Sequence, residues 1–92
     1  MKYYSIFLTE ETSNNSLEQV ESYITSEFFK WAKLGKYSYI VGVDKKTSAV
    51  SIRDRIKSSV SEPLDGLIVV GVTSEWASSQ LPDKVNSWLK NL

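Results

Sequence analysis

The chain of 92 residues has neither cysteine nor histidine, and its eleven basic and eleven acidic residues give a formal net charge of zero. Its length indicates one domain over residues 1–92, and the missing residue types exclude disulfides, thiolate metal sites and histidine-based catalysis. Without an overall basic field, nucleic-acid binding needs a local patch or one formed by pairing two subunits.

The sequence gives no sign of membrane targeting. Its N-terminal segment has one lysine and too short an apolar stretch for a signal peptide. No apolar run approaches the ~20 residues that cross a membrane. We therefore expect a cytoplasmic protein with no membrane association and no cofactor.

The first predicted elements are a strand and a helix. Residues 3–8 are rich in aromatic and β-branched side chains, which favours a strand. A polar loop follows, and Ser16 is predicted to cap a helix in a capping box closed by Gln19. Apolar residues then recur at helical spacing, to about residue 26, at Leu17, Val20 and Ile24.

The next segment predicts a β-hairpin. Its strands are expected at residues 28–34 and 37–43, joined by a tight turn at Gly35 and Lys36. The alternative extends the first helix through Trp31, because Phe28 and Trp31 continue its apolar stripe. We favour the hairpin.

The second half predicts a helix, a strand and a short terminal helix. Thr47 or Ser48 caps the first of these, whose apolar positions are Ala49, Ile52, Ile56 and Val60. Residues 67–72 are nearly all apolar, which favours a strand that is buried on both faces or central in a sheet. Pro82 begins the last helix, in which apolar residues recur at Val85, Trp88, Leu89 and Leu92.

This order predicts an α+β fold, the ferredoxin-like split β-α-β-β-α-β antiparallel sheet with a short C-terminal helix. The two longer helices would cover one face of the sheet. Because the strands are apolar on both sides, the second face needs another subunit or an added segment, and the terminal helix would cover part of it.

Residues 31–92 carry a family resemblance. The segment runs from a YSYIVGV strand through TSAVSIRDRIKSSV to LDGLIVVGVTSEWAS, and it closes with WLKNL. It resembles the small bacterial and phage proteins called SinR-like, relatives of the small subunit of the CRISPR spacer-integration complex. The resemblance implies a ferredoxin-like homodimer.

The resemblance also implies where a nuclease centre would lie. The activity proposed for that family depends on an aspartate at the end of the first strand, and two such carboxylates would hold a metal ion. Thr9 stands at about that place here, with Glu10 and Glu11 beyond it. Threonine cannot supply the negative charge, so we expect no catalytic residue. A metal site of Glu10 or Glu11 is the alternative.

Basic residues in and before the second predicted helix are the best candidates for a nucleic-acid surface. They are Lys45, Lys46, Arg53, Arg55 and Lys57. Arginine donors match phosphate oxygens and would position a nucleic-acid backbone without reading bases. The alternative, favoured for a single copy, is a solvated face on which Asp54 balances the charge. Pairing of two copies would strengthen the first interpretation.

Two further clusters have alternative interpretations. Lysines 30, 33 and 36 alternate with aromatic residues that would stack bases if exposed, namely Phe29, Trp31 and Tyr37. We favour core aromatics beside a protected sheet edge. Glu10, Glu11 and Asp44 would bind a divalent cation if they met at one end of the sheet, but we favour a solvated acidic loop.

The end of the last strand predicts an assembly surface. Trp76 is expected to be a plug or a subunit contact, and Trp88 and Leu92 are its expected companions. Glu75 would pair with an arginine of the second helix. Ser74, Ser78 and Ser79 are not expected to act as nucleophiles. The chain has no histidine and this segment has no Ser-x-x-Lys motif, so no nearby group would accept a proton from their hydroxyls.

We therefore expect a non-catalytic, homodimeric module that binds nucleic acid or a protein partner. The alternatives are a metal-dependent ribonuclease and a small phage- or plasmid-type inhibitor that docks a host protein. Nucleic-acid binding predicts affinity that falls steeply with salt. A ribonuclease predicts cleavage that a chelator abolishes, and a protein-binding module predicts neither.

Overall fold

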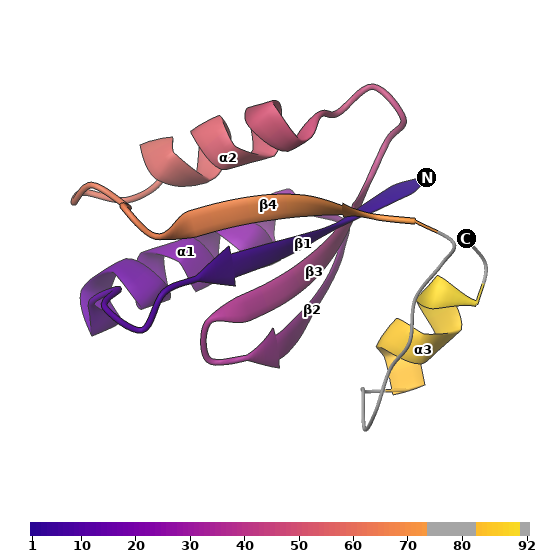
Figure 1. Ribbon diagram of the computed structural model, residues 1–92, viewed down its shortest axis with the longest axis horizontal. Coiled ribbons are helices and arrows are strands. Elements are labelled where there is room, and N and C mark those ends of the chain that lie inside the picture. The colour runs from indigo at the N-terminus through magenta and orange to yellow at the C-terminus, as the bar shows by residue number, and fades with distance from the viewer. Residues whose placement is uncertain (74–82, 91–92) are drawn as a thin grey trace.

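The computed structural model describes residues 1–73 and 83–90 and contains a four-stranded antiparallel sheet. The elements are β1 (Lys2–Leu8), α1 (Asn14–Glu27), β2 (Lys30–Gly35), β3 (Ser38–Val43), α2 (Ala49–Ser58), β4 (Leu67–Val72) and α3 (Asp83–Leu89). The strand order β2-β3-β1-β4 places β1 and β3 in the centre (Figure 1). The predicted α+β class is confirmed. No helix among the described residues is long and apolar enough to cross a membrane.

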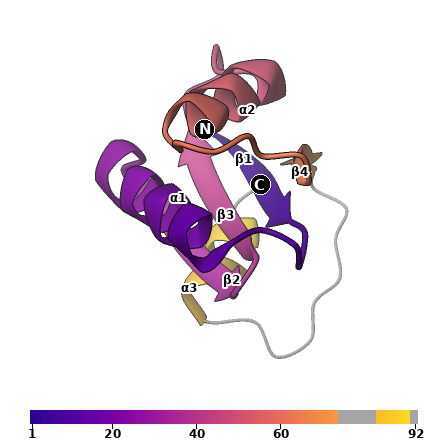
Figure 2. The same ribbon diagram turned by 90° about the vertical axis from the view of Figure 1, so that its left-hand side faces the viewer.

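The larger core lies between the sheet and the helices α1 and α2, which Figure 2 shows together on one side of the sheet. Antiparallel partners share a sheet face, so Ile6 lies on the same face as its partners Tyr39 and Val69. These side chains meet the fully buried members of the predicted helical stripes, which are Leu17, Val20, Ile24, Ile52 and Ile56. The stripe of α1 is confirmed, and so is that of α2 except for Val60, which packs against the core beyond the end of the helix at Ser58.

The opposite face of the sheet carries a smaller core beneath α3. Its buried members are Tyr3, Ala32, Ile40, Val85 and Leu89. Trp88 is half-buried against this cluster. The expectation that the terminal helix covers part of the second face is confirmed, whereas Pro82 and Leu92 lie outside the described residues.

Both longer helices begin at a serine cap. Ser13 caps α1, since its backbone is extended (φ −65°, ψ 155°) and its Oγ accepts a hydrogen bond from the backbone N–H of Ser16. The prediction of Ser16 as the cap was wrong because Ser16 lies inside the helix and is buried. Gln19 instead accepts the N–H of Ser61 at 3.0 Å. Ser48, one of two predicted caps, caps α2.

The hairpin is confirmed, but its first strand begins at Lys30 rather than at residue 28. Phe28 is the C-cap of α1, and its ring is buried in the larger core. The helical alternative was wrong, because Trp31 pairs with Val41 in the sheet. The turn lies at residues 36 and 37.

The position of β4 differs from the prediction. β4 is an edge strand, and Ile68 and Val70 are 57% and 43% exposed. The expectation of a strand that is buried on both faces or central in the sheet was wrong, because β4 lies at the edge and only its side that faces α2 packs against the larger core. The apolar side chains of Ile68 and Val70 therefore remain exposed on the second face of the sheet.

Candidate nucleic-acid interface

Lysines gather at one end of the sheet, although the net charge is zero. The strand register places Lys2 opposite Val43 and Lys30 opposite Gly42, so the starts of β1 and β2 and the end of β3 share this end. The exposed loop after β3 and the first turn of α3 add further lysines. We call this the basic end, which consists of Lys2, Lys30, Lys45, Lys46 and Lys84.

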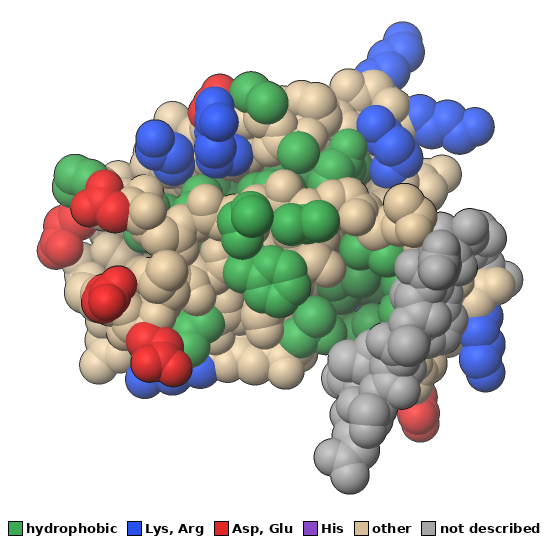
Figure 3. Space-filling view, in the orientation of Figure 1, with side chains coloured by type: hydrophobic (Ala, Val, Ile, Leu, Met, Phe, Trp, Pro, Cys, Tyr) green, Lys and Arg blue, Asp and Glu red, His purple; other side chains and the backbone are tan. Residues whose placement is uncertain are grey.

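Carboxylates gather at the other end of the sheet. Two glutamates follow β1 and two acids precede β4, and together they form the acidic end, which consists of Glu10, Glu11, Glu62 and Asp65. In Figure 3 most of the visible acidic side chains lie on the left, whereas basic side chains lie mainly on the right and along the top. Charge is therefore unevenly distributed along the strands of a molecule with no net charge, although Asp44 and Asp83 lie beside the lysines of the basic end.

Aromatic rings lie among the lysines of the basic end. Phe29, between α1 and β2, is 95% exposed, so the expectation of a core position was wrong for this ring. The Lys84 ammonium lies 5.3 Å from the ring centroid of Trp31 and 5.0 Å from that of Trp88. The Lys30 ammonium lies 5.9 Å from the centroid of Trp88. Cation–π attraction operates within about 6 Å, so it holds these ammonium groups in place without neutralising them.

Asp44 fixes the loop that carries Lys45 and Lys46. Its Oδ1 accepts the backbone N–H groups of Lys46 (2.8 Å) and Thr47 (3.0 Å) and the Thr47 hydroxyl (3.1 Å). The hydrogen bond from the Lys46 N–H is the largest cause that lowers the pKa of the Asp44 carboxyl. The side chains of Lys45 and Lys46 are exposed in this loop, and the Asp44 carboxylate lies close enough to Lys2 for that ammonium to contribute to its lowered pKa.

The basic residues of α2 do not share a face with the basic end. Arg55 Nε donates to the Tyr23 hydroxyl at 2.9 Å, and its guanidinium lies 5.2 Å from the Phe28 ring centroid. Arg53 lies on the opposite flank, where it lines a groove beside β4 and pairs with Asp54 at 2.9 Å. Arg55 therefore joins α2 to α1, and only Lys45 and Lys46 of the predicted basic set belong to the basic end.

Lys33 lies in a network outside the basic end. Its ammonium donates to Glu21 Oε1 at 2.6 Å, and the Tyr39 hydroxyl donates to the same oxygen at 3.1 Å. The hydrogen bond from Lys33 is the largest cause that lowers the pKa of Glu21. Burial is the largest cause that raises the pKa of Tyr39, and the bond to Glu21 adds to it. This network ties β2 and β3 to α1.

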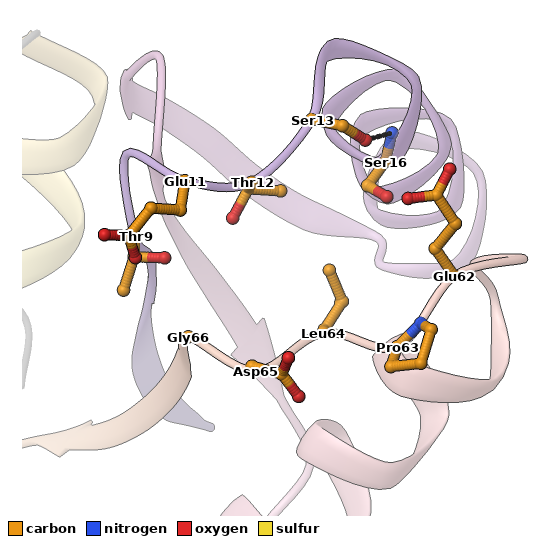
Figure 4. A pocket seen from close by; sticks show the side chains of 10 residues that line it. All are labelled: Thr9, Glu11, Thr12, Ser13, Ser16, Glu62, Pro63, Leu64, Asp65 and Gly66. Atoms are coloured by element: carbon orange, nitrogen blue, oxygen red, sulfur yellow. Dashed lines mark hydrogen bonds between the residues drawn. The ribbon is translucent and has the colours of Figure 1, made fainter.

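A cavity of about 280 Å³ lies at the acidic end, between the loop after β1 and the loop before β4. Figure 4 shows Glu11 and Glu62 on opposite sides of it rather than turned toward a common point. Among the described residues, no group of three or more His, Cys, Asp or Glu side chains could hold a metal ion. Asp44 lies at the opposite end of the sheet, so the structure does not bring it together with Glu10 and Glu11.

Thr9, at the place expected for an aspartate, packs against Gly66. The Thr9 N–H donates to the Gly66 carbonyl at 2.9 Å. A Cβ at position 66 would overlap the Thr9 side chain. Thr9 thus joins the end of β1 to the start of β4, and it presents a hydroxyl where a metal centre would need a carboxylate.

Comparison with known proteins adds no relative. No protein-family model, curated protein or solved structure matches the chain.

The sequence analysis did not predict Lys84 and Lys2 as members of the basic end. Lys84 and Trp88 are four residues apart, a spacing that places both side chains on one helix face and that could have revealed Lys84. Lys2 had no such signal, because its place depends on the strand register. The predicted residues around the end of β4, namely Ser74, Glu75, Trp76, Ser78 and Ser79, lie outside the described residues.

Proposed function

We propose that this chain is a non-catalytic, homodimeric module with a ferredoxin-like fold, and that its basic end binds single-stranded nucleic acid. The strand order β2-β3-β1-β4 and the two helices on one face support the fold assignment. The observation that carries the function is that the Phe29 ring, 95% exposed and next to Lys30, lies at the same end of the sheet as the lysines of the basic end.

The chemistry of the basic end suits an unpaired strand. Proteins that bind single strands without sequence preference combine a positive surface for the phosphates with aromatic rings on which bases stack. Lysine acts as a point charge, whereas arginine gives bidentate recognition. The basic end contains lysines and no arginine, which supports contacts to phosphates without reading of bases.

We also propose a relationship to the SinR-like relatives of the CRISPR small subunit, with the catalytic function lost. The hydroxyl of Thr9 and its packing against Gly66 support this loss, since neither provides a metal ligand of the required charge. Incubation with labelled RNA and magnesium checks the proposal. We expect no cleavage, and cleavage that a chelator abolishes would contradict it.

The binding test is fluorescence anisotropy with a labelled oligothymidine and with a duplex of the same length. We expect tighter binding to the single strand, with affinity that falls linearly with salt on a logarithmic scale as counterions are released. The double variant Lys45→Ala/Lys46→Ala should weaken binding. Lys36→Ala/Lys57→Ala is the matched control, because it removes the same charge away from the basic end.

Phe29→Ala tests the stacking contact. Stacking of a base on an aromatic side chain contributes about 1–3 kcal/mol, so we expect a loss of roughly fivefold or more in affinity. The variant should keep the stability of the parent protein, because the Phe29 ring is exposed. Equal affinity of Phe29→Ala and the parent protein, or equal loss in both lysine double variants, would overturn the proposal.

A further inference from the structure

The outer edge of β4 lacks the features that normally protect a sheet edge. Among the described residues no strand lies beyond it, and its sequence LIVVGV carries no charge. The other edge strand, β2, carries Lys30 and Lys33, and its pairing shifts register between Lys33 and Gly35. Charges and irregular pairing block the addition of another strand. The two edges of the sheet therefore differ in their capacity to pair.

The backbone groups of β4 are arranged for a further strand. The Gly66 carbonyl accepts the N–H of Thr9, so it points toward β1. Successive residues of an antiparallel strand direct their backbone groups to alternate sides. Leu67, Val69 and Gly71 therefore direct their N–H and C=O groups outward, where no described residue pairs with them.

Apolar side chains surround this edge. Ile68 and Val70 lie on the open face of the sheet and are 57% and 43% exposed. On the other side, Val50 of α2 is 56% exposed and lines the groove between α2 and β4 with Ala49 and Leu67. Figure 3 shows hydrophobic side chains at the centre of the face of which this edge is part.

We propose that a second copy of this chain pairs antiparallel with β4, about a two-fold axis that passes through Val69. This edge would be the contact surface of the homodimer in the proposed function. The inference therefore rests on that homodimer but not on nucleic-acid binding. Stable interfaces bury roughly 1,200–2,000 Å² in total, so the groove beside α2 takes part together with the strand edge.

The charge layout favours a second copy in this orientation. The acidic and basic ends lie at opposite ends of the strands. An antiparallel arrangement places the acidic end of each copy beside the basic end of the other, whereas a parallel one would place like charges together. Complementary potentials favour association and fix its orientation. Arg53 near the axis already has Asp54 as a counter-charge.

The axis through Val69 follows from the alternation of side chains. Paired residues must lie on the same face of the joined sheet. When Val69 lies opposite Val69 of the partner subunit, Leu67 lies opposite Gly71 of the partner subunit. These are the residues whose backbone groups point outward. On the open face, each Ile68 then lies opposite Val70 of the partner subunit. The exposed apolar side chains of both copies thus cover one another.

Mass measurement across a range of protein concentrations, without nucleic acid, tests the dimer. Light scattering should give twice the chain mass of 10.4 kDa at high concentration and a shift toward that mass on dilution. Val70→Lys should yield a monomer. Phe7→Lys is the matched control, because Phe7 is equally exposed at 43% on the same face but lies on the central strand β1.

Disruption by both lysine variants would contradict edge pairing and indicate stacking through the sheet face. A parent protein that stays monomeric at all concentrations would overturn the proposal. Circular dichroism of each variant verifies that it is folded. The nucleic-acid titration is separate, so its failure would leave the dimer result unchanged.

Cross-linking tests the register. The chain has no cysteine, so Ile68→Cys and Val70→Cys each add a single thiol. In the proposed register the two positions form a non-hydrogen-bonded pair with Cα atoms about 4.5 Å apart, which a disulfide can span. Mixing the two variants under mild oxidation should give the mixed disulfide dimer, whereas neither variant oxidised alone should form a disulfide dimer. A disulfide dimer of Val70→Cys alone would overturn the axis through Val69.

Discussion

Trp88 of α3 stacks on Tyr3 of β1, with ring centroids 5.7 Å apart and an interplanar angle of 26°. The surface below this pair is shaped by Gly42, since a Cβ there would come within 2.9 Å of Tyr3 Cε1. The terminal helix is therefore held by an aromatic contact that needs a glycine on the neighbouring strand.

Replacing Trp88 tests this attachment. Trp88→Ala should lower the free energy of unfolding by roughly 2 kcal/mol, less than the roughly 3–5 kcal/mol for a fully buried ring. Urea denaturation measures the change, and Trp88→Phe should recover much of it because it keeps a ring over Tyr3. Unchanged stability of Trp88→Ala would show that α3 does not depend on this stacking.

Gly66→Ala should destabilise the fold by about 1–3 kcal/mol, the usual cost of adding a methyl group to a tightly packed site. The new Cβ would overlap the Thr9 side chain, and Thr9→Gly in the same chain should restore part of the loss. Gly35→Ala is a suitable control, because its Cβ would meet only Ser38 Oγ at 3.4 Å. Thermal unfolding compares the variants, and equal losses for both single changes would count against the Thr9 contact.

Arg55→Ala should reduce stability without reducing nucleic-acid affinity. The variant loses a hydrogen bond to Tyr23 and a cation–π contact with Phe28, each of which contributes about 1 kcal/mol. Urea denaturation and anisotropy on the same sample separate the two effects. A large loss of affinity with unchanged stability would assign Arg55 to the binding surface instead.

The Glu21 network predicts a loss of stability in acid. The folded state holds the pKa of Glu21 below its ordinary value of 4.5. A depressed pKa contributes stability that is present above the unfolded value and is lost as the pH falls through the folded value. Glu21→Gln should therefore lose stability less steeply below pH 4.5 than the parent does. Urea denaturation midpoints at several pH values check this. An equally steep loss of stability in acid for Glu21→Gln and the parent protein would contradict it.

Tyr39 predicts a loss of stability in alkali. Its burial, and next its bond to Glu21, raise the pKa of its hydroxyl above the ordinary value of 10.0. The stabilisation is complete below that value and is lost as the pH rises toward the folded pKa. Tyr39→Phe keeps the ring and removes the hydroxyl, so its stability should fall less steeply above pH 10.0. If the stability of Tyr39→Phe falls as steeply in alkali as that of the parent protein, the Tyr39 hydroxyl does not cause the loss.

Features that depend on local spacing were predictable from the sequence. The apolar repeats of α1 and α2, exemplified by Val20 and Ile52, specify which face of each helix is buried. The start of α1 was less certain, because Ser13 and Ser16 are both suitable caps and only the observed turn selects between them. Local pattern thus specifies the helices better than their first residues.

Features that depend on strand order were not predictable in the same way. The apolar residues of β4 fit a central strand equally well, and only the order β2-β3-β1-β4 shows that Ile68 and Val70 lie at an edge. Likewise, Lys2 and Lys46 are far apart in sequence, and the antiparallel register of β1 and β3 places them at one end. The candidate interface is thus a property of the topology more than of any motif.

The basic and acidic ends give this molecule an uneven distribution of charge along its strands, although its net charge is zero. Near its isoelectric point of about 6.2 it should barely migrate in a uniform field, because the net force on it vanishes. A charged chromatographic surface differs from a uniform field. Its field is strong only within a screening length of about 8 Å, so it attracts only the end of the molecule that lies nearest to it. We therefore expect retention on both cation and anion exchangers, with opposite ends adsorbed and the remaining end left in solution.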